Sequence, residues 1–226
     1  IELKYQVPSP VIIALWGLES NFGRLMGNFS TIEVLATLAF EGRRRDFFQA
    51  ELMEALKMLQ NHSIDLSLLK GSWAGALGQT QFMPSSYNNH AVSEVEGKSF
   101  PNIWEIEGDV FCSIANYLHK EGWKYEEPWV IEVEIPLSLD RSLATLSLQK
   151  TTKEWQKLGV KPLKGRKFLY PHKRASLLIP EDSSQARAFL VYDNFRVILK
   201  WNRSINFALT VGILANEIKN NRRKIF

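Results

Sequence analysis

The chain has 226 residues, of which 45% are hydrophobic and 23% are charged, and it carries a formal net charge of +4. A chain of this length can bury a sizeable core, and this balance of apolar and charged residues is typical of a globular protein. No apolar stretch approaches the roughly 18 residues that a membrane-spanning helix needs.

Few side chains are available for disulfide or metal chemistry. Cys112 is the only cysteine, which excludes an internal disulfide and a multi-cysteine metal site. Its apolar neighbours in "DVFCSIANYL" predict a buried, unreactive thiol. The four histidines lack ligand spacings such as His-Glu-x-x-His, which disfavours a zinc site. The modest positive charge is compatible with an anionic polymer, but no basic helix indicates nucleic acid.

The first predicted helix follows the N-terminal residues. Ser9 is the expected N-cap and Pro10 the first helical residue. The helix should end near Asn21 to Gly23, where Gly23 can adopt a left-handed conformation. Its residues are apolar on every face, a pattern typical of a buried helix.

Glu19 ends this apolar run. It shares a helix face with Leu15 and Trp16, so we expect it to be half-buried. Loss of water contact there would raise the pKa of Glu19 and keep the carboxyl protonated, as a general acid requires. The alternative is a carboxylate at a helix end that pairs with Arg24 or with a backbone amide.

Further helices follow along the chain. The sequence Ser-Thr-Ile-Glu from Ser30 to Glu33 predicts a capping box that opens the second helix. Asp46, Asp109 and Ser204 are the expected starts of three more helices with apolar residues at helical spacing.

Between the last two of these helices, the hydrophobic pattern changes from helical spacing to the alternation of strands. Residues 129–137 alternate apolar and acidic residues at the period of a strand. The run "AFLVYDNFRVILKW" predicts two more strands joined by a hairpin turn at Asp193-Asn194. These patterns predict a mainly α member of the α+β class. We expect a mainly helical core over residues 1–126, completed by 200–226, with a smaller strand-containing insert at 127–199.

The stretch "LKGSWAGALGQTQFMPSSY", residues 69–87, mixes glycines, aromatic residues and amides. Glycines allow close backbone approach, aromatic rings offer flat surfaces to sugars, and glutamine both donates and accepts hydrogen bonds. No Gly-Lys-Ser/Thr follows, so the stretch is not a phosphate-binding loop. A tightly packed connection between helices is the alternative interpretation.

Several of these stretches together resemble the lytic murein transglycosylase B family, lysozyme-like enzymes that cleave bacterial peptidoglycan. The segments that carry the resemblance are "ALWGLESNFGRLMGN", "VLATLAF", "GSWAGALGQTQFMPSSY", "NIWE", "SIANYLHKEGW" and "LKWNRS". They occur in the family's order and span about residues 5 to 215. The resemblance implies a lysozyme-like catalytic core.

The resemblance also implies site residues. Glu19 matches the family's single catalytic glutamate. The positions that match substrate-contacting residues are Ser72, Gln81, Tyr117, Asn202, Arg44 and Arg45, with Trp201 where the family often has tyrosine. Trp201 lacks the tyrosine hydroxyl but keeps a stacking face.

The implied reaction is cleavage of the β-1,4 bond between N-acetylmuramic acid and N-acetylglucosamine, with a 1,6-anhydromuramic product. Glu19 would act first as general acid and then as general base. The alternatives are a hydrolytic muramidase of the lysozyme type and an inactive peptidoglycan-binding protein.

The implied setting is the bacterial periplasm, with peptidoglycan strands as the partner of a monomeric enzyme. We expect no cofactor and no nucleic acid. The start at Ile1 suggests a processed chain, whose full-length form would be either soluble or attached to the outer membrane by an N-terminal lipid anchor. The family often has a calcium loop before its "NxWD" element, but "AVSEVEGKSFPNIWE" lacks the alternating Asp ligands. We therefore expect no metal.

Overall fold

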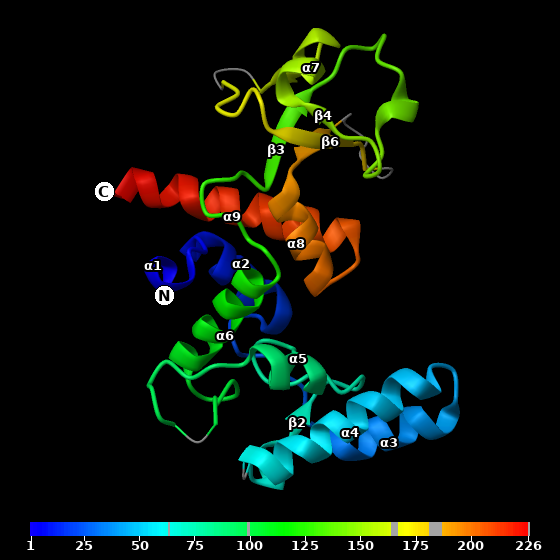
Figure 1. The fold of residues 1–226 in the computed structure, drawn as a ribbon, viewed down its shortest axis with the longest axis vertical. Coiled ribbons are helices and arrows are strands. Elements are labelled where there is room, and N and C mark those ends of the chain that lie inside the picture. Colours follow the sequence, from blue (N-terminus) through cyan, green and yellow to red (C-terminus); the bar gives the residue numbers. More distant parts are fainter. Residues whose placement is uncertain (63, 99, 164–166, 181–186, 226) are drawn as a thin grey trace. The chain divides into compact units, whose positions relative to one another are not determined.

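The computed structural model describes residues 1–62, 64–98, 100–163, 167–180 and 187–225. Its backbone contacts divide the chain into two compact units, Ile1–Lys120 and Glu121–Phe226, and each is described by itself (Figure 1). No helix in the described ranges combines the length and the apolar character that crossing a bilayer requires.

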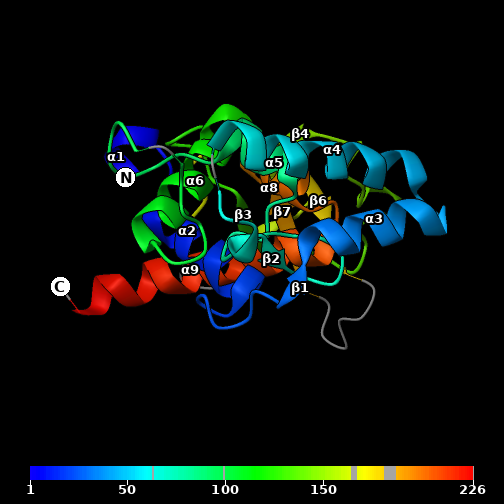
Figure 2. The same ribbon diagram turned by 90° about the horizontal axis from the view of Figure 1, so that it is seen from below.

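The regular secondary structure of the first unit is almost entirely helical. Its α-helices are α1 (Glu2–Tyr5), α2 (Ser9–Ser20), α3 (Thr31–Glu41), α4 (Arg45–His62), α5 (Pro84–His90) and α6 (Glu107–Lys120). A short 3-10 helix spans Leu66–Leu68, and strands β1 (Phe29–Ser30) and β2 (Lys70–Gly71) form an antiparallel pair. Both ribbon views show α3 and α4 lying side by side (Figures 1 and 2).

The second unit holds an antiparallel sheet with the strand order β4-β6-β7-β3-β5. The strands are β3 (Val130–Glu134), β4 (Lys150–Thr151), β5 (Lys161–Pro162), β6 (Arg174–Leu178) and β7 (Ala188–Val191). A 3-10 helix spans Arg141–Leu143, and the α-helices are α7 (Thr152–Lys157), α8 (Asp193–Trp201) and α9 (Ile205–Ile225).

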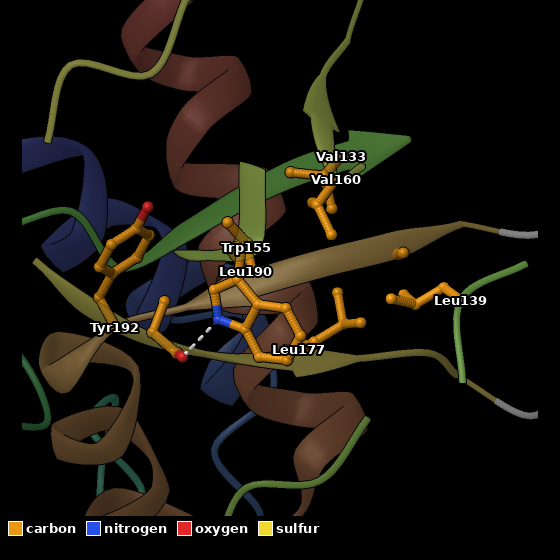
Figure 3. Packing of buried hydrophobic residues seen from close by; sticks show 9 residues of the cluster. Val133, Leu139, Trp155, Val160, Leu177, Leu190 and Tyr192 are labelled. Atoms are coloured by element: carbon orange, nitrogen blue, oxygen red, sulfur yellow. Dashed lines mark hydrogen bonds between the residues drawn. The ribbon is translucent and has the colours of Figure 1, made fainter. Parts of the chain in front are cut away.

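One face of this sheet packs around Trp155, which is fully buried on α7. Its indole N–H donates to the backbone oxygen of Ala175 at 2.9 Å, as Figure 3 shows. Leu177, Leu190 and Tyr192 surround it with further apolar surface. A buried indole whose N–H is satisfied contributes apolar burial without an unpaired donor.

The mainly helical α+β class is confirmed. The strands of the larger sheet fall within the predicted insert, 127–199, whereas α9 contacts β3 and α8 inside the second unit. The assignment of 200–226 to the catalytic core stays a prediction.

Two local predictions are wrong. Asp193-Asn194 begins α8 and is not a hairpin turn, because Asn194 is buried and its amide donates to the backbone oxygens of Lys124 and Glu127. Helix α3 begins after Ser30 as predicted, with Ser30 as N-cap, but the Ser30 side chain makes no capping hydrogen bond, so the capping box does not form. A smaller difference concerns α2, which starts one residue early, with Pro8 as N-cap.

Candidate active site

Glu19 lies in the last turn of α2 and is half-buried, as predicted. The helix body beneath it is apolar, and Ile12, Ala14 and Leu15 belong to the core. The carboxyl group therefore stands where a buried helix reaches the surface of the first unit.

The chain leaves α2 through three successive left-handed residues. Asn21, Phe22 and Gly23 have φ values of 47°, 58° and 78°. Such a conformation is unfavourable for phenylalanine, so its ring must gain compensating contacts. The ring lies against Gly17, where a Cβ atom would be 2.8 Å from it, and stacks edge-on with Trp16 at 5.2 Å.

The segment after this turn is fixed to the loop that carries Ser72 and Gln81. Gly27 packs directly on the backbone of Gly71, where no Cβ atom would fit. Gln81 donates from Nε2 to the backbone oxygen of Met26 at 3.1 Å. The segment that follows α2 and the loop over residues 71–82 are thereby joined by one backbone contact and one hydrogen bond from a side chain to the backbone.

Ser72 organises a tight turn at the start of this loop. Its Oγ accepts hydrogen bonds from the amides of Ala74 at 3.3 Å and Ala76 at 3.0 Å. A hydroxyl has two acceptor lone pairs and one hydrogen. With both lone pairs engaged, Ser72 can offer a ligand only its O–H donor.

Gln81 has the opposite polarity. Its backbone is left-handed, with φ 50°, and Nε2 donates to both Met26 and the backbone oxygen of Gly78, the latter at 2.8 Å. An amide nitrogen carries two hydrogens, and both are used within the protein. The atom that Gln81 can offer a ligand is the acceptor Oε1.

Tyr117 lies on α6 and is largely buried. Its ring packs on Phe82 at 5.8 Å and on His90 at 4.5 Å. Because Phe82 follows Gln81 directly, these contacts bring Tyr117 to the inner side of the loop.

Arg44 and Arg45 are exposed at the start of α4 in the first unit. The Arg44 guanidinium lies over the ring of Phe47 at 4.1 Å, a cation–π contact that fixes the side chain without neutralising its charge. Both arginines are therefore accessible to an anionic ligand.

Trp201 and Asn202 lie in the second unit, where α8 ends. Trp201 is half-buried, and the side-chain oxygen of Asn202 accepts from the amide of Ser204 at 3.0 Å. Their role in the site stays a prediction.

Gln79 is not among the site residues that the motifs predict. The structure shows this side chain buried, at 7% exposure, with Oε1 accepting from the indole N–H of Trp16 at 2.8 Å. The available signal was its place two residues before Gln81 in a glycine-rich run, but a partner 63 residues away cannot be read from a motif.

The loop between α5 and α6 has a carboxylate at its centre. Asp109 is fully buried and accepts from the Ser93 hydroxyl and from the amides of Glu94 and Asn102 at 2.8–2.9 Å. These three donors tie both ends of the loop to Asp109. No cluster of three or more His, Cys, Asp or Glu suited to a metal occurs among the described residues.

Comparison with protein families gives a match to the model described as Transglycosylase SLT domain over residues 1–216. Membrane-bound lytic murein transglycosylase B of Escherichia coli (strain K12) is 33% identical over 216 residues. The match covers 95% of this chain and 58% of that protein, so the chain spans little more than half of this relative's length.

Solved structures share the fold. SltB3 from Pseudomonas aeruginosa, in complex with NAG-NAM-pentapeptide, has a TM-score of 0.91 and 45% identity, covering 96% of this chain and 58% of that one. SltB1 from the same organism has a TM-score of 0.84 and 32% identity, covering 98% and 73%. Slt35 from E. coli, in complex with calcium, has a TM-score of 0.83 and 30% identity, covering 98% and 69%. The predicted family resemblance is confirmed.

Proposed function

The chain belongs to the transglycosylase SLT domain family, and we propose that it is a lytic transglycosylase that cleaves the MurNAc-β-1,4-GlcNAc bond of peptidoglycan. The E. coli relative is a lytic murein transglycosylase, and SltB3 has been solved with NAG-NAM-pentapeptide and with NAG-anhNAM-pentapeptide. The observation that carries the proposal is a half-buried Glu19 at a helix end fixed to the loop of Ser72 and Gln81.

Glu19 would transfer two protons. As an acid it protonates the bridging oxygen while the bond from that oxygen to C1 of the muramic acid breaks. As a carboxylate it then takes the proton of the C6 hydroxyl of the same sugar, whose oxygen bonds to C1. The nucleophile belongs to the substrate and is already close, so one carboxyl suffices where most glycosidases use two. The reaction yields a 1,6-anhydromuramic end and consumes no water.

The polarity of the loop supports an N-acetylated sugar as the ligand. Ser72 offers a donor and Gln81 offers an acceptor, because their other hydrogen-bonding positions are engaged within the protein. An acetamido group needs one donor for its carbonyl oxygen and one acceptor for its N–H. Both sugars of peptidoglycan carry such a group.

The remaining predicted residues receive supporting roles. Arg44 and Arg45 would pair with carboxylates of the stem peptide, since both guanidinium groups are exposed. Tyr117 would line the inner wall of the site, and the family resemblance assigns glycan contact to Trp201 and Asn202 as well. We place this enzyme in the periplasm as a monomer, either soluble or attached to the outer membrane.

Digestion of purified peptidoglycan, followed by mass analysis of the muropeptides, tests the proposal. The protein should release products lighter by one water than the hydrolytic products, and Glu19→Gln should release none. Glu33→Gln, at an exposed position on α3, should behave as the unchanged protein. Products with reducing ends alone would indicate a muramidase, and equal activity of the Glu19→Gln variant would remove Glu19 from its role. Glycan binding without products from any variant would indicate an inactive binding protein.

A further inference from the structure

Gln79 connects three segments of the first unit through one buried amide. Oε1 accepts from the Trp16 indole at 2.8 Å, and Nε2 donates to the backbone oxygen of Trp104 at 2.9 Å. The Gln79 backbone N–H donates to Ile103 at 2.9 Å. The side chain is thus held at both ends by groups of opposite polarity, which fixes the direction of the amide.

The partner on α2 is itself held. Trp16 stacks edge-on with Phe22 at 5.2 Å and with Phe111 at 4.9 Å, so its indole N–H has a fixed direction. Trp16 stands three residues before Glu19, in the turn of the helix directly beneath the carboxyl.

The turn after α2 meets the same amide. A Cβ atom on Gly23 would lie 2.5 Å from Oε1 of Gln79, so the Gly23 backbone rests directly on the amide. Gln79 therefore contacts the chain on both sides of Glu19, at Trp16 before it and at Gly23 after it.

We propose that Gln79 is a positioning residue for the transferred proton: it fixes the last turn of α2 and so sets where the Glu19 carboxyl points. This inference rests on the proposed role of Glu19. Only a side chain that accepts and donates at once serves both Trp16 and Trp104, and leucine of similar size does neither. A misplacement of about 1 Å at a catalytic group lowers the rate by up to about a hundredfold.

Three variants and two controls test the proposal by steady-state turnover of a soluble peptidoglycan fragment. Gln79→Leu removes both hydrogen bonds, and Trp16→Phe removes the indole donor while it keeps an aromatic ring. The double variant combines them. The controls are Gln60→Leu, at an exposed position on α4, and Trp123→Phe, whose indole nitrogen has no hydrogen-bond partner among the described residues.

We expect Gln79→Leu and Trp16→Phe each to lower kcat at least about tenfold, while KM changes less than about twofold, since both act on carboxyl position and not on sugar binding. The double variant should lose no more activity than the more impaired single variant, because both changes remove the same hydrogen bond between Trp16 and Gln79. All rates are measured well below the melting temperature of each variant. Unchanged kcat in both single variants, or losses that multiply in the double variant, would overturn the proposal.

Gln79→Glu adds a readout that a purely structural role would not move. A protonated glutamic acid can accept from Trp16 and donate to the Trp104 carbonyl, whereas a carboxylate cannot donate. The kcat of this variant, relative to the unchanged protein, should therefore rise as the pH falls through the pKa of the introduced glutamate, which burial and the Trp104 carbonyl raise above its ordinary value. A ratio independent of pH would contradict the assignment. Loss of activity in Glu19→Gln, together with full activity in the Gln79 variants, would overturn this inference and leave the proposed function intact.

Discussion

Gly27 is the position at which one added methyl group should disturb the site most. Its φ is 85°, and a Cβ atom there would lie on the backbone carbonyl of Gly71. That carbonyl cannot easily move, because the strand pair of Phe29 with Gly71 anchors the same backbone. Gly27→Ala should therefore force apart the two segments that connect Glu19 with Ser72.

The magnitude can be divided into two terms. A left-handed alanine costs about 1–2 kcal/mol of unfolding free energy, and a forced contact with packed backbone costs about 1–3 kcal/mol. Gly42→Ala carries only the first term, because φ is 91° but the nearest atom lies 3.9 Å away. Gly71→Ala carries only the second, because its added Cβ would meet the carbonyl oxygen of Ala76 without a left-handed φ.

Urea unfolding of the three variants, followed by circular dichroism, measures these terms. Gly42→Ala should lose about 1–2 kcal/mol and Gly27→Ala about 2–5 kcal/mol, with Gly71→Ala between them. Glycan cleavage by Gly27→Ala should fall further than its folded fraction, whereas Gly42→Ala should keep its rate. A loss of stability in Gly27→Ala no larger than in Gly42→Ala would refute the packing argument.

Trp73 is 70% exposed on the turn that Ser72 holds, so Trp73→Ala should weaken binding of a GlcNAc oligosaccharide by about three- to tenfold, as loss of one aromatic contact predicts. Calorimetric titration measures this, and unchanged affinity would remove Trp73 from the glycan surface. In the second unit, the hydrogen bond from Lys124 lowers the pKa of Asp193 below its ordinary value of 3.8. The pKa of Asp193 is lower in the folded protein than in the unfolded chain. The ion pair therefore stabilises the fold fully at neutral pH, and this stabilisation is lost as the pH falls through the folded pKa. The difference in unfolding free energy between the unchanged protein and Asp193→Asn should shrink from about pH 5 downwards, and a constant difference would contradict the assigned pair. Calcium should leave the melting temperature unchanged, because the Asp109 carboxylate already accepts three hydrogen bonds within the protein. A rise in melting temperature with calcium would show a cation site in this loop.

Helix starts with strong local signals were predicted from the sequence. Pro10, Asp46 and Ser204 all lie within the first turn of a helix or next to it. The hairpin turn predicted at Asp193-Asn194 is wrong because Asp and Asn favour both hairpin turns and helix N-termini. The deciding contact joins Asn194 to Lys124, 70 residues earlier, and no local pattern contains it.

The candidate site, too, has features that local motifs predict and features that depend on contacts distant in sequence. The motifs point to Glu19, Ser72 and Gln81, and the apolar run predicts correctly that Glu19 is half-buried. The hydrogen-bonding polarity of Ser72 and Gln81 could not be predicted. For Gln81 it depends on the backbone oxygen of Met26, which lies 55 residues away in sequence.

The motif Trp-Gly-Leu-Glu-Ser-Asn-Phe-Gly contains two residues that a helix end would ordinarily avoid. Gly17 lies inside α2, where glycine costs about 1 kcal/mol relative to alanine, and Phe22 adopts a left-handed conformation that costs about 1–2 kcal/mol. One contact accounts for both, since the Phe22 ring occupies the space that a Cβ atom on Gly17 would need. The ring then stacks on Trp16, which Gln79 holds. Two locally unfavourable residues thus become necessary once the turn that follows Glu19 must fold back onto its own helix.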